Sequence, residues 1–152
     1  MQVPRRAGLG ALLVAATLAG CAVPSTQTSA DDARALADAL APVTSAVQTA
    51  LVATDLLDRD RATASTVDTA LLDQLTVLQD AAGAVATLVP APGPGRDQQA
   101  EALAAVHDAE AAVAAARAWA TGAGGSVDEV TAALDDAATT VDDLTTALEQ
   151  AS

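Results

Sequence analysis

The chain contains few residues that could act as metal ligands or nucleophiles. His107 is the only histidine and Cys21 the only cysteine. Glu110 follows His107 by one helical turn, and Arg117 lies further along the same helical face. A di-iron or di-manganese bundle needs two Glu-x-x-His helices and two further glutamates, so a single histidine in the reversed order does not build such a centre. We therefore interpret His107 as a half-exposed side chain that pairs with Glu110.

Two short segments look superficially like ligand-binding loops. Residues 58–60 (DRD) pair two carboxylates, but an EF-hand needs further oxygen ligands at fixed offsets and a glycine at its sixth place. Residues 122–126 (GAGGS) lack the P-loop lysine, and Asp128 and Glu129 occupy the helical turn where a phosphate would sit. The chain also lacks a G-x-S-x-G nucleophile elbow. We therefore predict no catalytic residue, no metal site, no cofactor and no enzymatic activity.

The last predicted helix carries an unusual charge pattern, which we call the acidic strip. Seven carboxylates recur at seven-residue spacing on its outward face: Asp128, Glu129, Asp135, Asp136, Asp142, Asp143 and Glu149. No Lys or Arg occurs in residues 126–152 to offset them. The simpler interpretation is a solvated face that keeps the protein soluble. The functional interpretation is a docking strip for a basic partner or for divalent cations, although a spacing of about 10 Å makes cation binding weak and diffuse.

The N-terminal residues have the layout of an export signal. Arg5 and Arg6 supply positive charge, and residues 7–19 form an apolar run of 13 residues. Such a run is too short to span a hydrocarbon core of about 30 Å as a helix, but it suits the apolar region of a signal peptide. A twin-arginine signal has a bulky residue shortly after the arginines, and Ala7-Gly8 departs from that pattern. General secretion is therefore favoured.

The export signal ends in the sequence Leu18-Ala19-Gly20-Cys21. This quartet resembles the lipobox of bacterial lipoproteins at all four positions, and the resemblance covers residues 1–21 alone. It implies thioether attachment of diacylglycerol to Cys21, cleavage between Gly20 and Cys21, and acylation of the new N-terminus. The alternative is a secreted protein with an unmodified thiol. A lone cysteine forms no internal disulfide, which favours lipidation.

Composition and charge exclude several classes of protein. The 152 residues are 51% hydrophobic with a formal net charge of -13. Arg5 and Arg6 are the only charged residues among the first 20, so the remainder has a formal charge of -15. Nucleic-acid binding needs a basic face and is excluded, while direct adhesion to anionic headgroups is disfavoured. The chain holds 42 alanines and no Ile, Phe or Tyr, with Trp119 as its one aromatic residue, so it favours helices over strands.

Four apolar stripes with spacings of three and four residues predict four helices. Their members are Leu36, Leu40, Val43, Val47, Leu51 and Leu57; Val67, Leu71, Leu75, Leu78, Ala82, Val85 and Val89; Leu103, Val106, Val113 and Trp119; and Val127, Val130, Leu134, Ala137, Val141, Leu144 and Leu148. Residues 29–32 and 126–129 match capping boxes, and Asp97 is the expected cap of the third helix. Pro42 predicts a kink or a restart in the first helix.

Residues 58–64 (DRDRATA) decide between two folds. No Gly or Pro forces a turn there, so one helix over residues 31–89 within a three-helix coiled coil is the alternative. Continuing the first stripe would place Arg61 and Asp68 in the core. A turn instead gives four helices of about 25 residues, each about 38 Å long. Matched lengths and short connections favour an all-α, alanine-rich, antiparallel up-down four-helix bundle.

These observations divide the chain into three segments. Residues 1–20 are the expected signal peptide, residues 21–29 the lipidated cysteine with a polar tether, and residues 30–152 a single monomeric helical bundle. We expect an exported protein anchored by membrane lipid to the outer face of the cell membrane. It would act as a non-enzymatic binding or structural protein of the cell envelope, with a basic envelope protein as partner. The alternative is a solute- or signal-binding accessory module for a membrane transporter or sensor, with its pocket inside the bundle.

Replacing the cysteine tests the anchor. We expect the wild-type protein to partition into detergent with the membrane fraction and Cys21→Ser to remain in the aqueous phase, because two or more acyl chains anchor a protein stably. Phase partitioning and mass spectrometry of the mature N-terminus measure this. An intact, unmodified Cys21 in the mature wild-type protein would contradict the predicted localisation.

Overall fold

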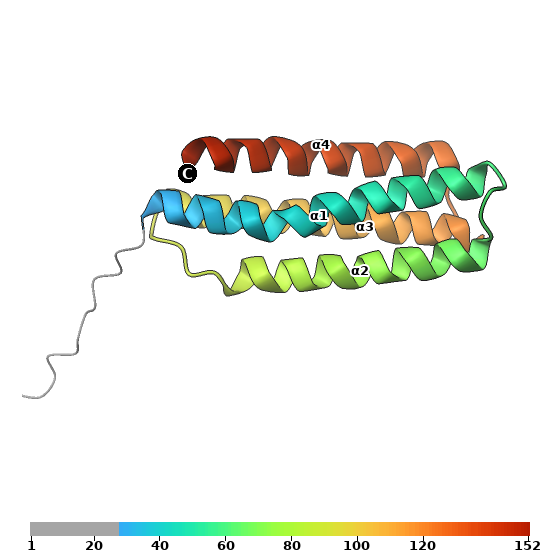
Figure 1. The fold of residues 1–152 in the computed structure, drawn as a ribbon, viewed down its shortest axis with the longest axis horizontal. Coiled ribbons are helices and arrows are strands. Elements are labelled where there is room, and N and C mark those ends of the chain that lie inside the picture. The colour runs from blue at the N-terminus through green and yellow to red at the C-terminus, as the bar shows by residue number, and fades with distance from the viewer. Residues whose placement is uncertain (1–27) are drawn as a thin grey trace, which may run out of the picture.

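The computed structural model describes residues 28–152, which form four helices that run side by side (Figure 1). These are α1 (Ser29–Asp58), α2 (Ala64–Thr87), α3 (Pro94–Ala120) and α4 (Val127–Ala151). Short connections join successive helices at alternate ends, so α1 and α3 run in one direction and α2 and α4 in the other. This confirms the predicted all-α four-helix bundle, and the three-helix alternative is wrong. The predicted signal peptide, with its predicted cleavage site between Gly20 and Cys21, lies outside the described residues.

The turn between α1 and α2 forms without glycine or proline. Asp60 adopts a left-handed conformation with φ 54°, which aspartate tolerates better than most residues. The N–H groups of Arg61 and Ala62 both donate to the carbonyl oxygen of Leu56, at 2.8 and 3.1 Å. These bonds satisfy a carbonyl group at the end of α1 and reverse the chain.

The first helix begins one residue earlier than predicted. The N-cap is Thr28 instead of Ser29: the Thr28 hydroxyl accepts from the Asp31 N–H at 3.2 Å, and the Asp31 carboxylate accepts from the Thr28 N–H at 3.0 Å. The capping box is therefore shifted by one position. Asp32, which the sequence assigned to the box, is only 3% exposed and accepts a hydrogen bond from the backbone N–H of Ala91 at 2.8 Å. Asp32 thus ties the α2–α3 connection to α1.

The third helix also begins before its predicted cap. Gly93 is the N-cap with φ 98°, Pro94 is the first helical residue, and Asp97 lies inside the first turn. Proline favours this position because its fixed φ suits the helix and its missing N–H would have no partner there. Gly95 is buried, and a Cβ on it would lie 3.2 Å from Oδ2 of Asp32. A glycine at this position therefore allows α1 to approach the start of α3 closely.

The predicted apolar stripes supply the core of the bundle. Its largest fully buried side chains are Leu36, Leu40, Leu71, Leu78, Leu134, Leu148, Val43, Val47, Val85, Val106, Val113 and Val141. The prediction that Val89 belongs to the second buried stripe is wrong, because Val89 lies beyond the end of α2 and is 83% exposed. The remaining members of the stripes are buried or half-buried.

The first helix continues through Pro42, so the predicted restart does not occur. Pro42 is exposed, which places its missing N–H hydrogen bond on the solvent side of α1. Among the described residues, α1 is the one helix long and apolar enough to cross a membrane by length and composition alone. Its buried apolar residues pack against α2, α3 and α4.

The third helix packs mainly through alanine. Its buried alanines are Ala102, Ala105, Ala109, Ala112, Ala116 and Ala120, and those of α1 are Ala33, Ala46, Ala50 and Ala53. Within residues 28–152, α1 and α3 contact each other across the bundle, whereas α2 and α4 do not. Small side chains allow helix axes to approach closely. We call this contact the α1–α3 diagonal.

A charge placed in the core tests the phase of α4. Leu134 is fully buried, so Leu134→Asp should bury an unpaired carboxylate and destabilise the bundle by about 4 kcal/mol or more, or unfold it. The matched control is Ala114→Asp on the exposed side of α3, which should change stability by no more than about 0.5 kcal/mol. Thermal unfolding followed by circular dichroism measures both. Equal melting temperatures for Leu134→Asp and the wild type would contradict the assigned core.

The capping box at α1 makes stability depend on pH. Hydrogen bonds from the backbone N–H and then the hydroxyl of Thr28 hold the pKa of the Asp31 carboxyl below its ordinary value. The cap therefore stabilises the fold above the pKa that Asp31 has in the unfolded chain, and this contribution is lost as pH falls through the lower folded pKa. We expect Asp31→Asn to lower the melting temperature at neutral pH, and the difference from wild type to shrink on acidification. A difference that stays constant down to the acid limit of folding would refute this role.

Candidate functional site

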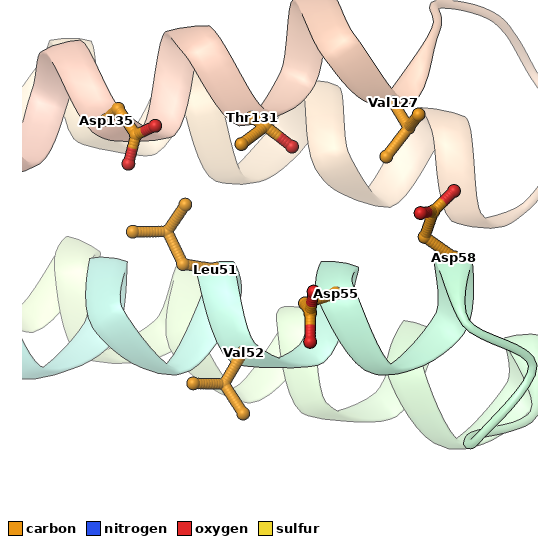
Figure 2. A pocket seen from close by; sticks show the side chains of 7 residues that line it. All are labelled: Leu51, Val52, Asp55, Asp58, Val127, Thr131 and Asp135. Carbon is orange, nitrogen blue, oxygen red and sulfur yellow. The ribbon is translucent and has the colours of Figure 1, made fainter.

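A solvent-open groove of about 370 Å³ lies between α1 and α4, near the end where α1 finishes and α4 begins (Figure 2). Its lining residues are Leu51, Val52, Asp55, Asp58, Val127, Thr131 and Asp135. Leu51 reaches from α1 toward α4, whereas Val52 points away from α4 and is 59% exposed (Figure 2). Leu51 and Val52 of α1 and Val127 of α4 thus form the apolar part of the groove surface.

Three carboxylates surround this apolar surface, and we call the whole the α1–α4 groove. Asp55 and Asp58 come from the last turns of α1, and Asp135 comes from α4 (Figure 2). Arg59 pairs with Asp55 at 2.6 Å, but both side chains are about half exposed or more, so water screens this pair. Asp58 and Asp135 are exposed, and neither belongs to the two ion pairs that join described residues. The groove therefore has a negative rim.

The acidic strip is exposed at all seven positions, but it is not one uniform face. Asp135 lines the α1–α4 groove, whereas its neighbour Asp136 lines a second hollow between α3 and α4, together with Asp108. The acidic strip is thus two rows about 100° apart around the axis of α4, one nearer α1 and the other nearer α3. Only the row toward α1 reaches the groove.

One member of the strip already has a structural role. The Glu129 carboxylate accepts hydrogen bonds from the backbone N–H of Ser126 at 3.0 Å and from its hydroxyl at 2.9 Å, while the Ser126 hydroxyl accepts from the Glu129 N–H. This confirms the capping box predicted at the start of α4. The GAGGS segment therefore ends in a helix cap.

The other candidate residues are dispersed. His107 is exposed and Glu110 half-buried, and no hydrogen bond or ion pair joins them within the part of the chain that the structure describes. The expected His107–Glu110 pair is therefore wrong. Arg117 instead donates to Asp68 at 2.6 Å and links α3 to α2. No group of three or more His, Cys, Asp or Glu side chains in residues 28–152 is arranged to hold a metal ion.

Further hollows lie at the surface between neighbouring helices. They occur between α3 and α4 and between α1 and α2, and each is open to solvent. The interior pocket that a solute-binding module would use is not among these hollows. The α1–α4 groove is lined by three carboxylates, whereas the hollows with Asp108 and Asp136 and with Asp38 and Asp80 are each lined by two.

The contribution of α1 to the groove was not predicted from the sequence. Asp55 and Asp58 lie one turn apart, which places them on one side of a helix. Nothing in the sequence shows which helix packs beside that side. A search for exposed carboxylates flanking the last apolar residues of the stripe would have selected them as candidates without naming Asp135 as their neighbour.

No family model, curated protein or solved structure matches this chain. The class of protein is therefore defined by its own geometry, which is an all-α antiparallel four-helix bundle. The function has to be argued from its surface.

Proposed function

We propose that the protein is a lipid-anchored, non-enzymatic binding protein at the outer face of the cell membrane, and that it docks a basic partner protein at the α1–α4 groove. The observation that carries this proposal is that Asp55 and Asp58 of α1 and Asp135 of α4 line one groove together with apolar side chains. A merely solvated face needs carboxylates, but it does not need an apolar groove between them.

The lipobox resemblance supports the anchor. Helix α1 begins at Ser29, eight residues after Cys21. Eight extended residues span at most about 28 Å, so a lipid on Cys21 would hold the folded domain close to the bilayer. A short tether followed directly by a folded domain suits a protein that works at the membrane surface.

The groove chemistry favours a partner that presents arginine or lysine. The aliphatic stem of such a side chain can cover the apolar surface of Leu51 and Val127 while its charged head meets the carboxylates. A volume of about 370 Å³ has room for one or two such side chains. The uncompensated carboxylates of α4 would extend the attraction beyond the groove and speed association.

Removing charge from α4 tests the docking role. The variant Asp135→Asn, Asp142→Asn, Asp143→Asn should stabilise the bundle slightly, because the neighbouring carboxylates on α4 repel one another. The same variant should slow association with the partner, and added salt should weaken wild-type binding strongly. Crosslinking in intact cells, followed by pull-down at low and moderate salt, identifies the partner for rate measurements.

A matched variant separates docking from net charge. Asp73→Asn, Asp80→Asn, Glu101→Gln removes three exposed carboxylates from α2 and α3, away from the groove. We expect this control to keep the partner and its association rate near those of the wild type. Two outcomes would contradict docking: identical partner sets from the wild type and the α4 variant, or an equal loss of association rate in both variants. Either would indicate that the acidic strip serves solubility alone.

A further inference from the structure

At the end of the bundle opposite the groove, the connection between α2 and α3 contains no charged residue. Residues 81–95 (AAGAVATLVPAPGPG) contain no charged side chain, although 18% of the whole chain is charged. Val89, in the connection between α2 and α3, is 83% exposed, more than any other large hydrophobic side chain that the structure describes. An exposed valine surrounded by small uncharged residues has no role in the core of this bundle.

The backbone of this connection is held in place on both sides of Val89. Oδ2 of the buried Asp32 accepts from the Ala91 N–H at 2.8 Å, and Nε2 of Gln99 donates to the carbonyl oxygen of Leu88 at 2.9 Å. These bonds come from α1 and α3, respectively, so two helices position the connection. Val89 is therefore presented on a supported backbone.

The same end of the bundle is where the chain toward Cys21 begins. Helix α1 starts beside the α2–α3 connection, as the contact between Asp32 and Ala91 shows (Figure 1). Thr28, the N-cap, follows Cys21 by seven residues, which span at most about 25 Å when extended. A lipid on Cys21 would therefore keep Val89 within reach of the bilayer surface.

We propose that the α2–α3 connection contacts the bilayer that holds Cys21, with the Val89 side chain inserted at the boundary between headgroups and acyl chains. This inference rests on the proposed lipid anchor. The tether keeps the connection at high local concentration beside the membrane, so a contact too weak to form from solution can persist. Residues 81–95 carry no carboxylate that anionic headgroups would repel, whereas the exposed Asp31 and Asp97 lie in the first turns of the two helices at the same end.

The lipid on Cys21 and the contact at Val89 would both hold the same end of the bundle, so its long axis would point away from the membrane. The groove residues Leu51 and Asp58 lie 22 and 29 residues along α1 from Ser29. At 1.5 Å per residue, the groove is about 33 to 44 Å from the membrane-facing end. The bundle thus acts as a spacer that presents its negative groove away from the lipid surface.

A tryptophan at Val89 tests the contact. The full chain is produced in a bacterium, extracted from its membranes and reconstituted into phosphatidylcholine vesicles with or without brominated acyl chains. The matched control is Val52→Trp, at an exposed residue that lines the groove at the other end of the bundle. Trp119, one residue before the end of α3 at the groove end, is an internal reference in both variants. We expect Val89→Trp to show emission at shorter wavelength and a loss of emission in brominated vesicles, while Val52→Trp and Trp119 show neither.

Each other outcome overturns the inference in an identifiable way. The protein could float with the vesicles while both variants lose emission equally or neither loses any. That outcome would support the lipid anchor and refute the contact of Val89 with the bilayer. A concentration-dependent spectral shift of Val89→Trp without vesicles would show that a second copy of the chain covers Val89 instead. Protein that fails to float and carries an unmodified Cys21 would refute the anchor, and this inference with it. Helical content from circular dichroism verifies that both variants fold.

Discussion

The contact between α1 and α3 across the bundle decides how the other two helices are placed. Alanine buries little apolar area, so a helix whose buried positions include Ala102, Ala109 and Ala116 contributes through tight packing more than through the size of its side chains. Among the helices that the structure describes, α1 and α3 contact each other, whereas α2 and α4 do not, and each of α2 and α4 contacts both α1 and α3. Each outer helix therefore borders α1 along one flank, and the candidate groove lies on such a border.

The two ends of the bundle differ in chemistry. At one end Asp32 and Gln99 hold an uncharged connection that exposes Val89. At the other end, Asp58 and Asp135 face a groove with apolar surface. An uncharged connection with one exposed valine at one end and a negative groove at the other agree with the proposed tether at a lipid surface. The long axis of the bundle separates the two contacts, so each can be altered without disturbing the other.

Much of the fold could be predicted because helical periodicity dictates which face is buried. The stripe from Val127 to Leu148 and the capping box at Ser126 were correct, since both depend only on residues within one helix. The turn at residues 58–64 was also correct: a continued stripe would have buried Arg61, which is exposed on the turn instead. The exposure of the acidic strip followed from the same periodicity. Its proposed role in docking depends on a neighbouring helix.

By itself, the sequence determined the helical class, the number of helices and the phase of each apolar stripe, because these depend on interactions within a few turns of the chain. Only the tertiary structure decided that Asp32 accepts a hydrogen bond from Ala91 instead of completing a capping box. It also decided that Val89 lies outside the core, and that Asp55 of α1 lines the same groove as Asp135 of α4. These outcomes depend on which helices are neighbours and how closely they approach. Both depend on packing summed over the whole bundle, which no local pattern encodes.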